Sequence, residues 1–160
     1  MPTATVSLRE RAIQALTRSE KTRAQLRTLL LRHGTPDAVE VVLDTLEAEK
    51  LLSDTRAAEA RVRKAHQKGH AQARILQDLE TAGVSSQDAA RAVAEALDGV
   101  DERGALAGQA AALLGRSPSS KDRQRVARRL LRMGFGEEDV ARVCGLEDLA
   151  DPSTDGWDGP

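Results

Sequence analysis

Three segments of this chain end in glycine and share one spacing of apolar residues. They are residues 23–34, 72–83 and 123–134. Apolar residues four apart lie on one face of a helix. A glycine just after the last of them is a favoured helix stop, because glycine adopts the left-handed cap without steric cost. The glycines and the apolar residues eight and four positions before them are Gly34 with Leu26 and Leu30, Gly83 with Ile75 and Leu79, and Gly134 with Val126 and Leu130.

The three glycines are 49 and 51 residues apart, which indicates one helical unit used three times. A period of this length predicts stacked units that share a core along a line. The aromatic residues are only Phe135 and Trp157, so the core must consist of leucine, valine and alanine. No segment alternates apolar and polar residues with β-branched enrichment, as strands do. The sequence therefore predicts an all-α fold of three tandem three-helix repeats forming an elongated array.

Helix-start residues divide the chain further. The repeats are predicted at residues 1–52, 53–99 and 100–145, followed by an acidic tail at residues 146–160 that is disordered or loosely held. In the first repeat we expect Ser7 and Ser19 to cap two helices and Pro36 to open the third. In the second, Ser85 resembles the start of a capping box. The apolar residues after two of the glycines, Val84 and Phe135, are expected to pack beneath the helix caps.

No set of residues in the sequence has the spacing of a catalytic or metal site. The histidines are His33, His66 and His70, and Gly69 interrupts the closest pair. Cys144 is the only cysteine, which excludes an internal disulfide and is typical of a small buried side chain. We therefore expect a protein that is not an enzyme and needs no cofactor or metal. No apolar run approaches a membrane span of about 20 residues, and a cytoplasmic protein is expected.

Charge is unevenly distributed along the chain. The tail holds five acidic residues and no Lys or Arg, so without it the net charge of −1 becomes +4. Acidic residues also gather at 37–49, and their spacing is that of the exposed face of a helix. Basic residues gather at 56–74 and 116–132. The candidate residues for binding a partner or DNA are Arg61, Lys64, Lys68, Arg74, Lys121, Arg125, Arg128, Arg129 and Arg132.

The helix expected near residues 120–133 carries the strongest of these basic faces. Val126 and Leu130 should face the core, with Ala127 and Met133 as further candidates, which leaves the arginines on the remaining surface. Guanidinium groups bind phosphates and carboxylates in a bidentate manner. Two interpretations remain open: a binding face, or a solvated helix whose arginines pair with the tail or with a neighbouring unit. No aromatic residues are interleaved, so single- or double-stranded DNA would bind through phosphates, weakly and with strong salt dependence.

Four stretches of the sequence, within residues 18–34, 51–58, 68–83 and 128–135, together resemble the bacterial RecX family of regulatory proteins. The second, residues 51–58, is similar to the family phrase Gly-Tyr-Leu-Asp-Asp-x-Arg-Phe-Ala, although Leu51, Ser53 and Ala57 replace three of its residues. The likeness covers about residues 8–145, and the acidic tail has no counterpart in it. The other stretches are Arg18-Ser19-Glu20 with Gln25-Leu26 and Gly34, Lys68-Gly69 with Ala73-Arg74-Ile75 and Leu79 to Gly83, and Arg128 to Phe135.

The resemblance implies three tandem three-helix repeats. It also implies a regulator, most often an inhibitor, of the RecA recombinase. Such a regulator would bind in the groove of the RecA–DNA filament and limit recombination, DNA repair and the SOS response. The expected partners are thus the RecA filament and DNA phosphates, with the protein acting as a monomer.

Two other functions fit the residues. A three-helix unit with a basic last helix could place that helix in a DNA groove, as a transcription regulator does. A passive helical adaptor would need neither DNA nor RecA. We also expect that deleting residues 146–160 raises nonspecific affinity for DNA, because the tail competes for the basic faces.

Overall fold

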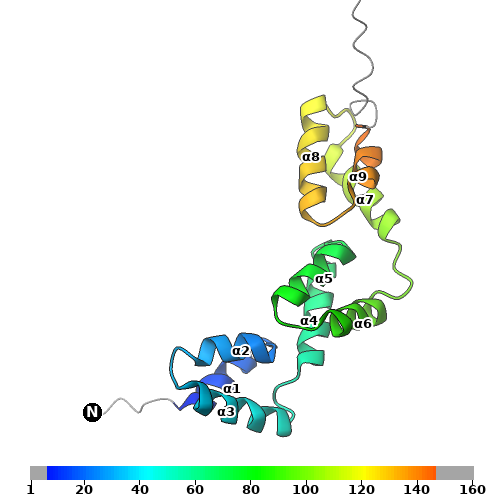
Figure 1. Ribbon diagram of the computed structural model, residues 1–160. Helices are drawn as coiled ribbons and strands as arrows, with labels where there is room; N and C mark the ends of the chain where they lie inside the picture. Colours follow the sequence, from blue (N-terminus) through cyan, green and yellow to red (C-terminus); the bar gives the residue numbers. More distant parts are fainter. Residues whose placement is uncertain (1–6, 147–160) are drawn as a thin grey trace, which may run out of the picture. The chain divides into compact units, whose positions relative to one another are not determined.

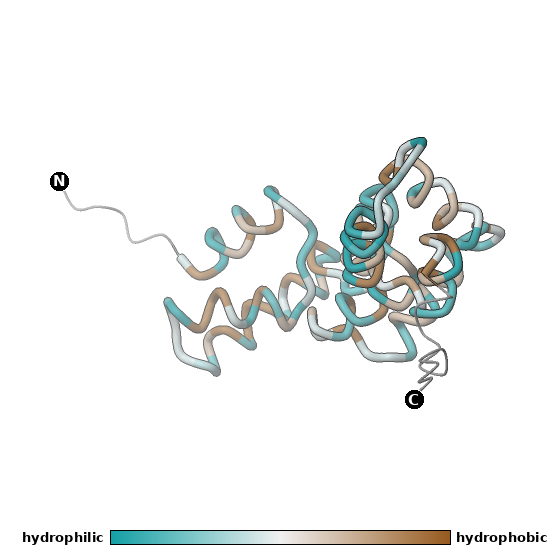
Figure 2. The backbone as a smooth tube through the Cα atoms, turned by 90° about the horizontal axis from the view of Figure 1, so that it is seen from above, coloured by the Kyte–Doolittle hydropathy of each residue, from teal (hydrophilic) through white to brown (hydrophobic). Residues whose placement is uncertain are grey.

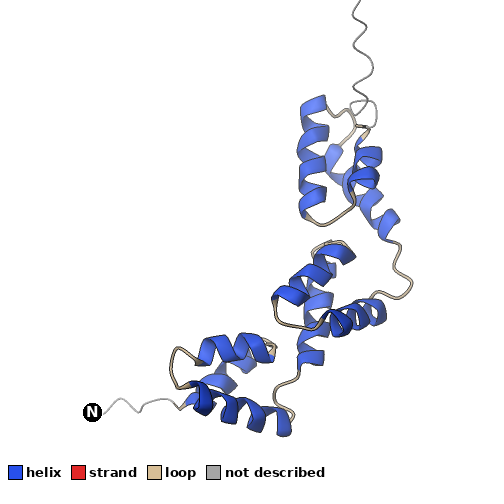
Figure 3. Ribbon diagram, viewed as in Figure 1, coloured by secondary structure: helices blue, strands red, loops and turns tan. Residues whose placement is uncertain are grey.

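The computed structural model describes residues 7–146, which form nine helices and no strand (Figure 3). The predicted all-helical class is confirmed. The predicted acidic tail lies, but for Leu146, outside the described residues. The helices, labelled in Figure 1, are α1 (Leu8–Arg18), α2 (Arg23–Leu30), α3 (Pro36–Ala48), α4 (Asp54–Gln67), α5 (Gln72–Thr81), α6 (Ser86–Ala96), α7 (Glu102–Leu114), α8 (Ser120–Arg132) and α9 (Glu137–Cys144).

The described residues group into two compact units. Unit 1 consists of residues 7–65 and 75–98, and unit 2 of residues 66–74 and 99–146. In unit 1, α1, α2 and α3 pack around leucine, valine and alanine side chains. In unit 2, α7, α8 and α9 pack around a second core that includes Phe135 and Cys144. Hydrophobic residues recur along the helices as bands separated by hydrophilic ones (Figure 2), as expected when each helix buries one face.

Side-chain caps fix most of the helix starts. Ser7 forms a capping box with Glu10 at α1, and Pro36 stands in the first turn of α3, as predicted. At α6 the Ser85 hydroxyl accepts the Asp88 N–H and donates to the Asp88 carboxylate, so the predicted cap is present without the return bond to the Ser85 N–H that would complete a capping box. The prediction that Ser19 caps the second helix is wrong. Thr22 caps α2 instead, because its hydroxyl accepts the Gln25 N–H.

Thr22 is fully buried, and its Oγ1 also donates to the carbonyl of Ala82. A contact to a residue 60 positions away along the chain leaves no local pattern in the sequence. The hydroxyl therefore starts α2 and joins α2 to the end of α5 within unit 1.

Gly83 and Gly134 end their helices in the predicted left-handed conformation. Their φ angles are 86° and 94°. The following N–H groups, of Val84 and Phe135, donate to the carbonyls of Leu79 and Leu130, as in a Schellman cap. Both side chains are buried, which confirms that these residues pack beneath the caps.

The prediction of a left-handed glycine cap is wrong for Gly34. Helix α2 already ends at Leu30, and Gly34 is absent from the left-handed region. A Cβ atom there would lie 2.5 Å from Cδ1 of Leu8. Gly34 is thus kept small by packing against α1 and does not act as a helix cap.

The left-handed cap in this part of unit 1 belongs to Lys50, with a φ of 60°. The N–H groups of Lys50 and Leu51 donate to the carbonyls of Glu47 and Leu46, each at 2.9 Å. A side chain with a β-carbon raises the energy of this conformation, and glycine does not. We therefore expect Lys50→Gly to raise the free energy of unfolding by about 1 kcal/mol in urea titrations.

Lys50→Ala is the matched control, because it removes the same charge and keeps the β-carbon. It should leave the free energy of unfolding within about 0.5 kcal/mol of the parent value. Equal gains for Lys50→Gly and Lys50→Ala would show that charge, and not backbone conformation, controls this site.

One set of hydrogen bonds occurs twice, once in each unit. Twelve residues before Gly34 and Gly83 stand Thr22 and Ala71. The Thr22 hydroxyl donates to the carbonyl of Ala82, and the Ala71 N–H donates to that of Met133 at 2.9 Å. The next N–H groups bind carboxylates at the start of another helix: Arg23 binds Asp54 and Gln72 binds Glu102, both at 2.6 Å. The second set attaches residues 66–74 to α7 and α8.

Candidate functional site

Helix α8 presents the basic face predicted from the sequence. Ser119 caps it in a box with Asp122, and the hydrogen bonds from Ser119 lower the pKa of that carboxyl. Val126, Ala127 and Leu130 are buried, so the prediction of which residues face the core is confirmed. The exposed basic residues of the helix are Lys121, Arg125, Arg128, Arg129 and Arg132.

Most of these cations form no ion pair in the part of the chain that the structure describes. Arg125 lies 3.0 Å from a carboxylate oxygen of Asp122. Within residues 7–146, Lys121, Arg128, Arg129 and Arg132 form no ion pair. A row of guanidinium groups without carboxylate partners is suited to binding several phosphates or carboxylates at once.

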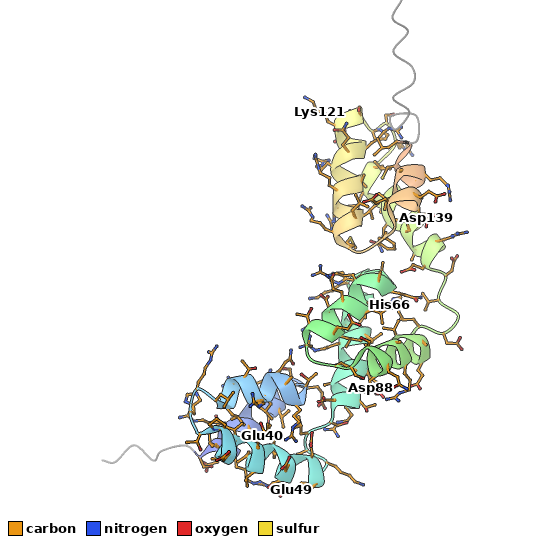
Figure 4. The ribbon with its side chains drawn as sticks, viewed as in Figure 1. Glu40, Glu49, His66, Asp88, Lys121 and Asp139 are labelled. Carbon is orange, nitrogen blue, oxygen red and sulfur yellow. The ribbon has the colours of Figure 1, made fainter. Side chains whose placement is uncertain are left out.

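A hollow of about 360 Å³ lies at the C-terminal end of α8. Lys68 and Arg129 line it, so the structure brings together two candidate residues that are 61 positions apart in the sequence. The Gln109 amide donates to the carbonyl of Gly69 at 3.1 Å and so ties the loop after α4 to α7. Figure 4 labels Lys121 at one end of α8 and His66, which also lines the hollow, beyond the other.

The other candidate residues lie elsewhere. Arg74 belongs to unit 2, is exposed, and has its backbone against Gly134. Arg61 and Lys64 belong to unit 1. Lys64 is exposed, but Arg61 is partly buried and its Nε has no acceptor among residues 7–146. The hollow and α8 thus form the main basic surface of unit 2.

The acidic residues of α3 form a network that the sequence did not predict. Arg23 reaches from α2 to Glu40, Asp44 and Glu47 at 2.6–2.7 Å, and Arg27 also binds Glu40. Hydrogen bonds from Arg27 and Arg23 lower the pKa of Glu40. The sequence signal for this network is the pair Arg23 and Arg27, eleven and seven residues before Gly34. Only the packing of α2 on α3 shows which carboxylates these arginines bind.

We expect Arg23→Ala to lower the free energy of unfolding by about 1–2 kcal/mol at pH 7, because three carboxylates lose a shared cation. A lowered folded pKa stabilises the protein above the unfolded value, about 4.3 for Glu, and this stabilisation is lost as pH falls through the folded pKa. The deficit of the variant should therefore shrink as the pH falls from about 5 to about 3. Urea titrations across this range measure it.

Arg9→Ala is a suitable control, because Arg9 forms one half-exposed ion pair with Glu49. Its cost should stay below about 0.5 kcal/mol. A deficit for Arg23→Ala that is the same at about pH 3 and at pH 7 would show that packing, and not charge, explains the loss.

The described residues contain no cluster of three His, Cys, Asp or Glu side chains able to hold a metal ion. Cys144 is fully buried, as expected for a small core side chain, and burial raises the pKa of its thiol. Within residues 7–146 no helix has the length and apolar character needed to cross a bilayer.

Comparison with known proteins places the chain in a family. No family model matches it. "Regulatory protein RecX" of Ralstonia pickettii is 31% identical over 155 residues, which cover 93% of this chain and 94% of that protein. The protein of the same name from Pseudomonas entomophila is 31% identical over 91% of this chain and 95% of its own length. The protein of this name from Ralstonia nicotianae is 45% identical over 83 residues, which cover 51% of this chain and 51% of that protein.

Solved structures agree on the fold. The crystal structure of RecX from Lactobacillus salivarius aligns with a TM-score of 0.67 at 18% identity and covers 89% of this chain and 95% of that one. A second crystal structure of a regulatory protein RecX aligns with a TM-score of 0.64 at 20% identity. The match covers 89% of this chain and 73% of that one. With relatives that match it over nearly its whole length at 31% identity, this chain belongs to the RecX family of regulatory proteins.

Proposed function

We propose that this protein regulates the RecA recombinase, as an inhibitor that binds in the groove of the RecA–DNA filament. The observation that supports this best is the row of exposed arginines on α8, of which Arg128, Arg129 and Arg132 form no ion pair among the described residues. In a filament groove this face would lie against DNA phosphates or protein carboxylates, and guanidinium groups bind both. Membership of a family of regulatory proteins supports a binding role over an enzymatic one.

We also propose that the chain is built from three tandem three-helix repeats, α1–α3, α4–α6 and α7–α9. The set of hydrogen bonds that occurs twice supports this, because equivalent positions before Gly34 and Gly83 make equivalent contacts. Repeats that are joined to one another by the same contacts form a continuous surface along which a polymer can bind. The basic residues of α8, the loop after α4 and Arg74 would be one part of that surface.

DNA contact in this proposal is electrostatic and independent of sequence. Helix α8 carries no aromatic residue, so its basic face offers bases no ring on which to stack. Binding through phosphates alone is weak and falls steeply with salt. The protein would therefore rely on RecA for specificity. We also propose that it acts as a monomer in the cytoplasm.

Measuring the DNA-dependent ATP hydrolysis of RecA tests the proposal. Addition of this protein at a small fraction of the RecA concentration should suppress the hydrolysis. Tight, sequence-specific binding to duplex DNA without any effect on RecA would favour a transcription regulator instead. A protein that affects neither would be a passive adaptor, and the proposal would be wrong.

A further inference from the structure

The hollow at the C-terminal end of α8 is lined by basic and apolar side chains together. The exposed residues Lys68 and Arg129 line it, and so do Ala112, Leu113 and Met133. Its other side chains, of His66, Gln67 and Gln109, are polar. None of its lining side chains is acidic. A site of this kind favours an aromatic group that stands next to carboxylates, because the ring covers apolar surface while the carboxylates meet the cations.

The chain itself contains such a segment. Residues 155–158 read Asp-Gly-Trp-Asp, so the only tryptophan of the protein lies between two carboxylates. This segment belongs to unit 2 by connection, since the chain leaves the described structure at Leu146, directly after α9. There Nη1 of Arg123, in the first turns of α8, donates to the carbonyl of Cys144 at 2.9 Å. The chain thus leaves next to the N-terminal end of α8, and the hollow lies at the other end.

The connecting residues are long enough to reach. From Arg123 to Arg129, α8 rises roughly 9 Å at 1.5 Å per residue. The eleven residues from Leu146 to Trp157 span up to about 36 Å when extended. Length therefore places no obstacle between the end of α9 and the hollow, and the acidic residues on the way would pass the arginines of α8.

We propose that residues 155–158 dock in this hollow of their own chain, with Trp157 against its apolar side chains and Asp155 and Asp158 beside Lys68 and Arg129. The docked segment covers the end of the basic surface and so competes with any phosphate-bearing ligand. An intramolecular ligand on a short linker acts at an effective concentration of about millimolar, so even a weak contact is substantially occupied. The consequence for RecA rests on the proposed function, but the docking itself does not.

Because Trp157 is the only tryptophan, its fluorescence reports the docking directly. In the full chain at about 20 mM salt, where charges interact over roughly 20 Å, Trp157 should emit at shorter wavelength than free N-acetyl-tryptophanamide. Acrylamide should quench it less. Lys68→Glu combined with Arg129→Glu should remove both effects, and so should 0.5 M salt, where the Debye length falls to roughly 4 Å.

Two further variants keep the test independent of folding. Arg91→Glu with Arg103→Glu makes the same charge change at exposed positions that do not line the hollow and should leave the fluorescence unchanged. Asp155→Asn with Asp158→Asn alters only the docking segment and should expose Trp157 as the double reversal does. Equal quenching of Trp157 in the parent chain and in all variants would overturn the proposal. Protection that grows with protein concentration would do so too, because it would place the segment on a second copy.

Competition is measured without RecA. Trp157→Ser should bind a fluorescein-labelled oligothymidylate about two- to tenfold more tightly than the parent chain at low salt, since it no longer competes for the hollow. Unchanged affinity would overturn the competition. A result that confirms docking while RecA hydrolysis is unaffected would reject only the proposed function.

Discussion

Gly134→Ala is expected to lower the free energy of unfolding of unit 2 by about 3 kcal/mol or more. Two costs add here. The φ of 94° is disfavoured for any residue with a β-carbon. The new atom would also lie 2.9 Å from the backbone nitrogen of Arg74 and in contact with the Cβ of Arg74. A backbone neighbour moves only if the seam between residues 66–74 and α8 opens, and the hydrogen bond from Ala71 to Met133 would be strained with it.

Two other glycines of unit 2 separate these costs. Gly99 has a φ of 71° and nothing within 4 Å of its Cβ position, so Gly99→Ala should cost only about 1 kcal/mol. Gly108 lies within α7, also with nothing within 4 Å, and Gly108→Ala should stabilise the helix by roughly 0.5–1 kcal/mol. Urea titrations followed by circular dichroism compare the three. A loss for Gly134→Ala no larger than that for Gly99→Ala would show that the contact with Arg74 is unimportant.

Reversing the charges of α8 is expected to have the largest effect on function. With Arg125, Arg128, Arg129 and Arg132 changed to Glu, inhibition of RecA hydrolysis should need roughly 100-fold more protein at 0.1 M salt. The reason is counterion release, because the salt exponent of DNA binding falls by about 0.9 for each phosphate that the protein no longer neutralises. The slope of log affinity for DNA against log salt should therefore fall by up to about 4.

The fold should tolerate this change, because all four side chains are exposed and the core of α8 is untouched. The control reverses four exposed arginines outside α8, namely Arg18, Arg32, Arg91 and Arg103, and so makes an equal change in net charge. It should keep most of the inhibition. Equal inhibition by the α8 variant and the parent chain, at matched melting temperatures, would exclude this face from the RecA or DNA contact.

Local patterns in the sequence predicted several of the helix starts and ends. Ser7, Pro36 and Ser85 begin helices because a hydroxyl cap or a fixed φ acts within one turn. Gly83 and Gly134 end them because the left-handed cap depends on the residue itself. The buried face of α8 followed from apolar spacing in the same way. Each of these effects lies within a few residues along the chain.

The errors arose where a distant contact competed with a local pattern. Thr22 displaced Ser19 as a cap because it also binds Ala82, and Gly34 is small because Leu8 packs on it. Lys50 takes a glycine conformation that its own chemistry opposes. The sequence by itself determined the helices and the row of arginines on α8, because both depend on periodicity. Only the tertiary structure decided that Arg23 neutralises α3 and that Lys68 meets Arg129 at one hollow, because through-space pairing depends on how the helices pack.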